Sequence, residues 1–168
     1  MDSEFRAWLV EHRGDAGRQY QLAGITAATI KDYILREMTI AIGESDWETY
    51  RTLFTMAHRI ENPEVRADVF NHLLVMPGHD LHQEVTMAIQ RLESPSSVPY
   101  IESVLRGGFG FLAYTSSEDA VIAKWFSHAL ARIDTPESIA LIEEFAVCDN
   151  AGIAEEMRYR LDRLAGRE

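Results

Sequence analysis

Apolar residues recur at helical spacing along most of the chain. Within Glu118–Ile133, five of them share one face of a 3.6-residue period: Ile122, Phe126, Ala129, Leu130 and Ile133. The same reasoning predicts further helices over Ser3–Glu11, Thr26–Ile42, Ser45–Ile60, Pro63–Val75, Asp80–Leu92, Ser94–Arg106 and Gly152–Ala165, with another after Pro136. Gly14–Gly24 is a variable linker or partial helix. No segment predicts a strand, so we expect an all-α protein.

A short phrase occurs three times. RIENPE begins at Arg59, RLESPS at Arg91 and RIDTPE at Arg132, so the offsets are 32 and 41 residues. In each copy Asn, Ser or Thr precedes Pro; these are good N-cap residues, and Pro is favoured at the first helical position. Each copy therefore predicts a helix–turn–helix corner. The pattern Ser45-x-x-Glu48 predicts a capping box at another helix start.

These corners resemble HEAT-like repeats of the short bacterial type, in which a helix ending in Arg and Ile or Leu turns into a second helix. The segments Ser97–Ile101 and Ser138–Ile142 stand where that second helix belongs, and the resemblance covers Ser45–Glu168. It implies antiparallel helix pairs stacked as a short α-solenoid. The usual glycine before the acidic turn residue is missing, and the glycine-rich loop Gly107–Phe111 lengthens the second offset. The tetratricopeptide signature is absent.

The repeats predict the domain organisation of the whole chain. We expect a single all-α domain over 1–168, with irregular cap helices in 1–43 and HEAT-like repeats in 44–168. No apolar run is long enough for a membrane helix, and no signal peptide is visible. With Cys148 as the only cysteine, an internal disulfide is impossible, which favours a reducing, cytoplasmic location.

The charge points to a class of partner. The formal net charge is −11, which disfavours nucleic acid and is compatible either with a basic protein partner or with solubility alone. Seven acids and no Lys or Arg lie between Ile133 and Met157. The partner-binding candidates from this run are Glu143, Glu144, Asp149, Glu155 and Glu156; the alternative is a solvated face. Tyr114 and Trp125 are candidate aromatic anchors. Phe109, Phe111 and Tyr114 either fold back onto the core or anchor a partner.

Candidate chemistry is sparse. His72, His79 and His82 could approach a metal, but turn and cap roles are favoured because no matching ligand pair recurs. Cys148 stands beside Asp149, which suits a small core residue better than a reactive thiolate. No catalytic triad, carboxylate pair or phosphate-binding loop is present in the sequence. We therefore expect no catalytic residue, no metal and no cofactor.

Small HEAT-like proteins that resemble this chain include bacterial immunity proteins. The resemblance therefore implies a non-catalytic protein-binding module that inhibits a cognate, basic toxin domain. Three alternatives stay open: a HEAT-repeat enzyme similar to the bilin lyases, an adaptor for a disordered peptide, and a DNA-repair glycosylase, which the charge disfavours.

Overall fold

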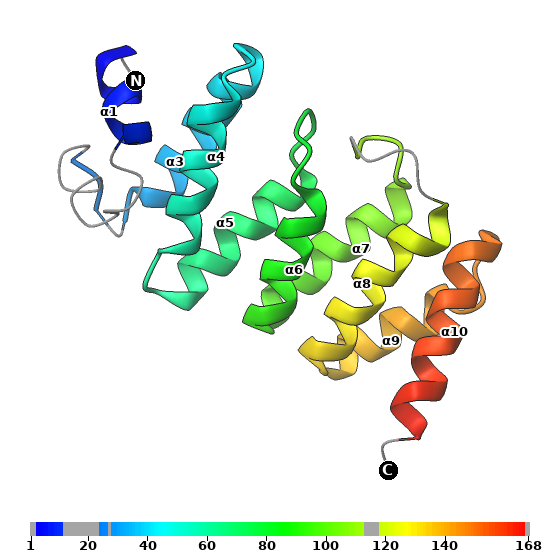
Figure 1. The fold of residues 1–168 in the computed structure, drawn as a ribbon. Coiled ribbons are helices and arrows are strands. Elements are labelled where there is room, and N and C mark those ends of the chain that lie inside the picture. Colours follow the sequence, from blue (N-terminus) through cyan, green and yellow to red (C-terminus); the bar gives the residue numbers. More distant parts are fainter. Residues whose placement is uncertain (1–2, 12–23, 27, 113–117, 167–168) are drawn as a thin grey trace. The chain divides into compact units, whose positions relative to one another are not determined.

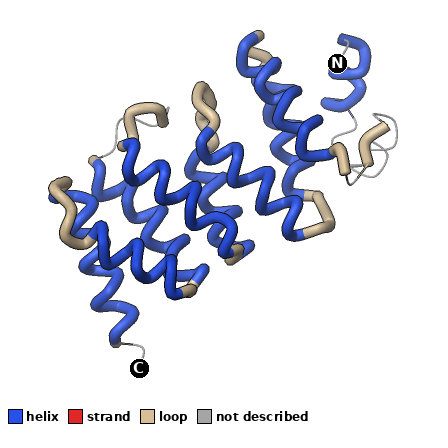
Figure 2. Tube along the Cα trace, turned by 180° about the vertical axis from the view of Figure 1, so that it is seen from behind, coloured by secondary structure: helices blue, strands red, loops and turns tan. Residues whose placement is uncertain are grey.

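The computed structural model describes residues 3–11, 24–26, 28–112 and 118–166, and every regular element in these ranges is a helix (Figures 1 and 2). The α-helices are α1 Ser3–Glu11, α3 Ile30–Gly43, α4 Trp47–His58, α5 Pro63–Val75, α6 His82–Leu92, α7 Val98–Gly107, α8 Asp119–Ile133, α9 Pro136–Phe145 and α10 Ala151–Ala165. The all-α prediction is confirmed for these residues. Most of Gly14–Gly24 lies outside them. No described helix has the length and apolarity needed to cross a membrane.

The chain divides into two compact units, Met1–Val69 and Phe70–Glu168, with the boundary inside α5. In the first unit α4 packs against both α1 and α3. Its core is apolar and fully buried at Leu9, Ile34, Met38, Tyr50 and Leu53. Buried apolar side chains on one face of each helix are what hold such short helices, since isolated ones are marginal in water.

The second unit has α8 at its centre. Helix α8 packs against α6 on one side and α10 on the other, while α7 and α9 contact each other and α8. Helices α6, α8 and α10 thus form one row, and α7 and α9 belong to a second (Figure 1). Phe126, Ile101 and Ile142 are fully buried between these rows. Because every other helix is a neighbour in space, surface residues of α6, α8 and α10 can share one face.

The three predicted corners differ in detail. The side chain of Asn62 accepts hydrogen bonds from the backbone N–H groups of Glu64 and Val65, which caps α5 as predicted. Thr135 caps α9 in a reciprocal capping box with Ser138. Ser94 makes no such bond. The proline after it opens a 3₁₀ turn, η1 (Pro95–Ser97), and α7 begins only after this turn, so the prediction of an α-helix from Ser94 is wrong.

At two of the corners that lack the usual glycine, the acidic turn residue itself adopts the left-handed backbone conformation. Glu93 and Asp134 end α6 and α8 with φ of 52°, a region that costs most residues about 1 kcal/mol or more. The guanidinium of Arg132, at the end of α8, forms an ion pair with Glu93 at the end of α6. Successive corners of the second unit are therefore in direct contact.

The start of α4 corrects another prediction. Ser45 has a φ of 57° and lies outside the helix. Asp46 is the N-cap instead, and its carboxylate accepts a hydrogen bond from the Thr49 N–H at 3.1 Å. The capping box expected between Ser45 and Glu48 is not the cap of this helix.

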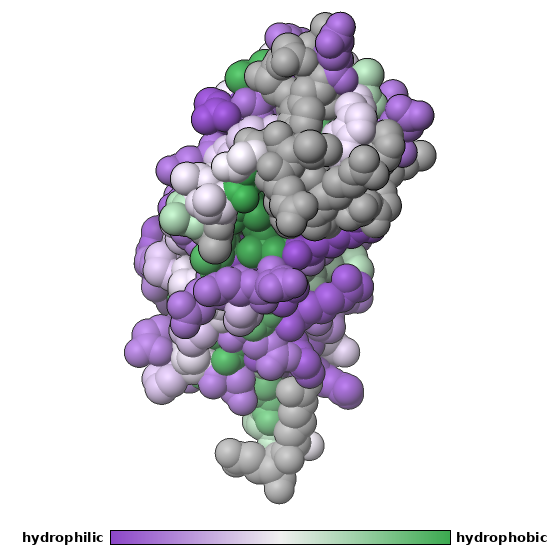
Figure 3. Space-filling view, turned by 90° about the vertical axis from the view of Figure 1, so that its left-hand side faces the viewer, coloured by the Kyte–Doolittle hydropathy of each residue, from purple (hydrophilic) through white to green (hydrophobic). Residues whose placement is uncertain are grey.

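One face of the molecule shows the distribution of polar residues. Hydrophilic residues, in purple, predominate on the face seen in Figure 3. Among the described residues, six large apolar side chains are exposed: Trp47, Val75, Met87, Val121, Val147 and Tyr159. Single exposed apolar residues need no explanation, but those that lie beside a groove or among unpaired charges mark candidate contact sites.

Candidate functional surfaces

Three of the five acidic candidates stand free on the surface of the second unit. Glu143 is on α9, Asp149 is in the turn between α9 and α10, and Glu155 is on α10. All three are exposed, and none forms an ion pair within the described part of the chain. We call these three residues, with the turn 146–150 between their helices, the acidic corner. Its three unpaired carboxylates are available to an external cation.

Glu144 is also exposed, but it is paired within the molecule. Each of its two carboxylate oxygens binds one terminal nitrogen of the Arg106 guanidinium, at distances of 2.7 and 2.9 Å. The Nε of Arg106 donates to Glu102 at 2.8 Å, and its guanidinium lies 5.6 Å from the centre of the Phe145 ring. The hydrogen bond that Arg106 donates to Glu144, followed by the one that it donates to Glu102, raises the pKa of Arg106. The charge of Glu144 is thus already compensated by Arg106 within the molecule.

Glu156 points inward, so its place on an exposed acidic surface is corrected. Its side chain is 13% exposed and its Oε1 accepts from the Ser127 hydroxyl of α8 at 2.6 Å and from Arg160 at 3.1 Å. Arg160, 5% exposed, also donates from Nε to the Ser127 oxygen at 3.2 Å. This closed triangle ties α10 to α8. A carboxylate in such a position serves the fold and cannot meet a partner.

Hydrogen bonds hold the acidic corner in one shape. The Asn150 side chain caps α10 and its amide donates to Asp119 in the first turn of α8. Arg158 donates to the carbonyl oxygen of Ala146 at 2.8 Å. Between these anchors Val147 is 82% exposed. Val147 is therefore an exposed apolar side chain in the same turn as Asp149, and hydrogen bonds hold both ends of this turn.

Trp125 lies elsewhere, in a groove of about 270 Å³ between α6 and α8. Its neighbours along the groove are Met87 on α6, and Lys124 and His128 on α8. Trp125 is half-buried, and Met87 is exposed. The other aromatic candidate, Tyr114, lies outside the described residues.

The remaining loop aromatics fold back onto the second unit. Phe109 is buried and stacks on Phe126 of α8, with ring centres 5.8 Å apart. Phe111 packs its ring at right angles to His82, at 5.4 Å. Of the two alternatives for these residues, packing on the core is confirmed for Phe109 and Phe111.

Two of the three candidate histidines cap a helix. The rings of His79 and His82 stack at 3.8 Å. The Nε2–H of His79 donates to the carbonyl of Leu73, and that of His82 donates to the carbonyl of Met76, so both bond with the C-terminal turn of α5 and the residue after it. The Nδ1 of His79 accepts from the backbone N–H of Leu81. The turn and cap role favoured by the sequence is confirmed for this pair.

This arrangement favours the neutral form of both imidazoles. Burial lowers the pKa of His79 and, together with repulsion from His79, lowers that of His82 to about 4. His72 is apart from the pair, with its ring 5.4 Å from that of Tyr100. Within the residues described, no three His, Cys, Asp or Glu side chains are grouped to hold a metal ion.

Cys148 is half-buried in the acidic corner, where its thiol donates a weak hydrogen bond to the carbonyl of Asn150 at 3.6 Å. It is thus less buried than the core position that the sequence suggested. It borders a depression of about 350 Å³ that also includes the Arg106–Glu144 pair. In this part of the chain, no base or cation has been found within hydrogen-bond distance to activate the thiol.

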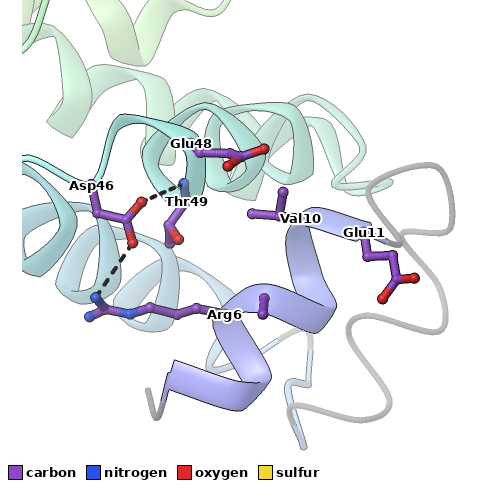
Figure 4. A pocket seen from close by; sticks show the side chains of 7 residues that line it. Arg6, Val10, Glu11, Asp46, Glu48 and Thr49 are labelled. Atoms are coloured by element: carbon purple, nitrogen blue, oxygen red, sulfur yellow. Dashed lines mark hydrogen bonds and ion pairs between the residues drawn. The ribbon is translucent and has the colours of Figure 1, made fainter.

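The first unit has a groove of its own between α1 and α4, of about 460 Å³ (Figure 4). Arg6 extends from α1 toward Asp46, 3.6 Å away, and also forms an ion pair with Glu44. Val10 lines the apolar side, and Glu48 the acidic one. The hydrogen bond with Glu44 raises the pKa of Arg6. Arg6, the one cation among the described residues that line this groove, is thus neutralised by two carboxylates.

Sequence reasoning missed the features that make the acidic corner rigid. The Asn150–Asp119 bond joins residues 31 apart, and no local pattern indicates it. Val147 was not singled out from the sequence; it lies beyond the end of α9 at Phe145. The Glu156–Arg160 pair, by contrast, has i,i+4 spacing that the sequence displays.

Comparison with known proteins adds no family: no protein-family model, curated protein or solved structure matches the chain. The function must be argued from its own surfaces.

Proposed function

We propose that this protein is a non-catalytic, HEAT-like helical scaffold that binds a basic protein partner. Its sharpest form is an immunity protein that neutralises a toxin domain in the cytoplasm. The alternating rows of the second unit and the contact between successive corners through Arg132 and Glu93 support a solenoid of antiparallel pairs.

The observation that carries the proposal is the acidic corner. Glu143, Asp149 and Glu155 are exposed and unpaired in the described part of the molecule, whereas Glu144 and Glu156 have their own arginines. Uncompensated charge of one sign accelerates association with a partner of the opposite sign. Val147, exposed in the same turn as Asp149, adds an apolar contact.

A basic toxin domain fits this surface better than a small substrate does. A toxin that acts on nucleic acid needs a positive substrate-binding face, and an acidic corner held on a fixed backbone can cover it. The side chains of Asn150 and Arg158 bond with the backbone at either end of the turn 146–150, so little conformational freedom is lost on binding.

A selection tests this function. Fragments of the source genome are expressed one by one in a bacterial host, and those that stop growth are combined with this chain. We expect at least one basic product whose toxicity the chain suppresses. The variant Glu143→Lys, Asp149→Lys, Glu155→Lys should fold but fail to suppress it. Suppression of no toxic fragment, or equal suppression by the variant, contradicts the proposal.

A further inference from the structure

The groove between α6 and α8 is built from one face of each helix. On α6 the lining residues stand at positions i, i+3, i+4 and i+7: Gln83, Thr86, Met87 and Gln90. On α8 they stand at i, i+1 and i+4: Lys124, Trp125 and His128. Residues at these helical spacings are neighbours on the surface. The groove therefore follows the axes of two packed helices rather than being an isolated dent.

Two carboxamides mark its length. Gln83 and Gln90 are two helical turns apart, about 10.5 Å along the axis at 1.5 Å per residue. In the ranges that the structure covers, neither side chain makes a hydrogen bond of its own, so both amides are available. A carboxamide donates and accepts, as a peptide backbone requires. An extended chain rises about 3.3 Å per residue, so three of its residues span the distance between the two amides.

Apolar contact comes from the middle of the groove. Met87 lies on α6 between the two glutamines and is 43% exposed. Trp125 faces the same groove from α8 and is half-buried. The flexible thioether of Met87 and the indole of Trp125 together form an adaptable binding site for one apolar side chain. Tryptophan is also among the residues that dominate binding energy at interfaces.

The charge of the groove identifies the occupant. The chain has two lysines, Lys31 and Lys124. Lys31 forms an ion pair with Asp68 at 2.8 Å, but Lys124 is exposed and has no ion pair among the described side chains. In a protein of net charge −11, an uncompensated cation beside an apolar seat is complementary to a carboxylate.

We propose that the groove between α6 and α8 binds an extended acidic segment of a partner protein. A carboxylate within that segment pairs with Lys124, and an apolar side chain of the segment lies between Met87 and Trp125. The backbone of the segment bonds with Gln83 and Gln90. This site is separate from the acidic corner and uses the opposite charge, so it stands or falls independently of the basic partner proposed above.

The test uses the full chain and a displayed library of random nine-residue peptides. We expect the enriched peptides to carry an internal Asp or Glu and an apolar residue within three positions of it. One enriched peptide is then made with both ends blocked, and its affinity is measured by fluorescence anisotropy. Lys124→Glu should weaken its binding about tenfold or more, because the variant removes a charge-assisted bond and adds a repulsion. Trp125→Ala should weaken it similarly.

A matched control is Arg91→Glu, which makes the same charge change at an exposed site on α6 outside the lining of the groove. It should bind the peptide within about twofold of the parent, a difference of less than 0.5 kcal/mol. Circular dichroism of each variant establishes that the fold is intact. The proposal is overturned if no peptide is enriched, if only a free C-terminal carboxylate binds, or if Lys124→Glu and Arg91→Glu weaken binding equally.

Discussion

Glu155 and Glu156 are consecutive residues of α10, and they lie in opposite environments. Glu155 belongs to the acidic corner and is exposed. Glu156 lies in the interface between α8 and α10, where Ser127 and Arg160 bind its carboxylate. The difference shows that an acidic run contains two kinds of charge: one that holds helices together and one that remains for a partner. Only the second kind can carry the proposed function.

The largest expected effect on stability concerns Glu156, the buried member of this pair. Glu156→Ala should lower the free energy of unfolding by about 3 kcal/mol, because it leaves the buried guanidinium of Arg160 without its partner. Glu155→Ala, one residue away, should change it by less than about 0.5 kcal/mol. Urea unfolding of the two variants gives both values. Equal effects would mean that the two carboxylates do not differ.

A second buried polar group, the stacked His79–His82 pair, predicts a pH dependence. The pKa of His82 is lowered to about 4, so the unfolded chain binds a proton that the folded protein excludes. Its stabilisation is complete above about pH 6.5 and is lost as the pH falls toward 4, by about 3 kcal/mol at most. Asp80 and Glu84 face the pair and reduce the loss. Unfolding measured at several pH values gives this curve.

The variant His82→Gln should flatten that curve between pH 6.5 and 4. A curve equally steep in the parent and in His82→Gln would show that the buried pair does not titrate in this way.

The helix corners predict smaller effects. Thr135→Ala removes a side-chain cap from α9 and should cost about 1 kcal/mol. Ser94→Ala is the matched change at a corner where the side chain makes no cap bond, and it should cost less than about 0.5 kcal/mol. Thermal unfolding distinguishes them. A cost at Ser94 as large as at Thr135 would contradict the assignment of the caps.

Much of the fold follows from local sequence. Apolar spacing and Asn/Thr-Pro pairs set where α5 and α9 begin, since a cap and a fixed proline φ act within one turn. Ser45 failed as a predictor because Asp46, the next residue, is an equally good cap and took the role. Ser94 failed because the chain forms a 3₁₀ turn at Pro95 before its helix.

The candidate surfaces were harder to predict than the helices. Whether an acid is free depends on side chains far away in the sequence: Arg106 bonds with Glu144 from 38 residues away, and Ser127 bonds with Glu156 from 29. Packing of α6 on α8 creates the groove beside Trp125, which no spacing within one helix reveals. Charge composition therefore indicated the sign of a partner but not the carboxylates that could meet it.

The change with the smallest expected effect on stability is the most informative for function. Glu143→Lys, Asp149→Lys, Glu155→Lys should leave the unfolding free energy within about 0.5 kcal/mol per site, because all three are exposed and unpaired in the described structure. Circular dichroism and urea unfolding measure it. A large loss of stability would mean that these carboxylates hold the fold together, as Glu156 does.

The most direct measurement is the association rate of this triple variant with the basic partner found by selection, at low and at high salt. The account predicts association slower than that of the parent by about tenfold or more at low salt, with the difference shrinking as salt screens the charges. If the variant associates as fast as the parent at low salt, the acidic corner is only a solvated surface, and the proposed mode of binding is wrong.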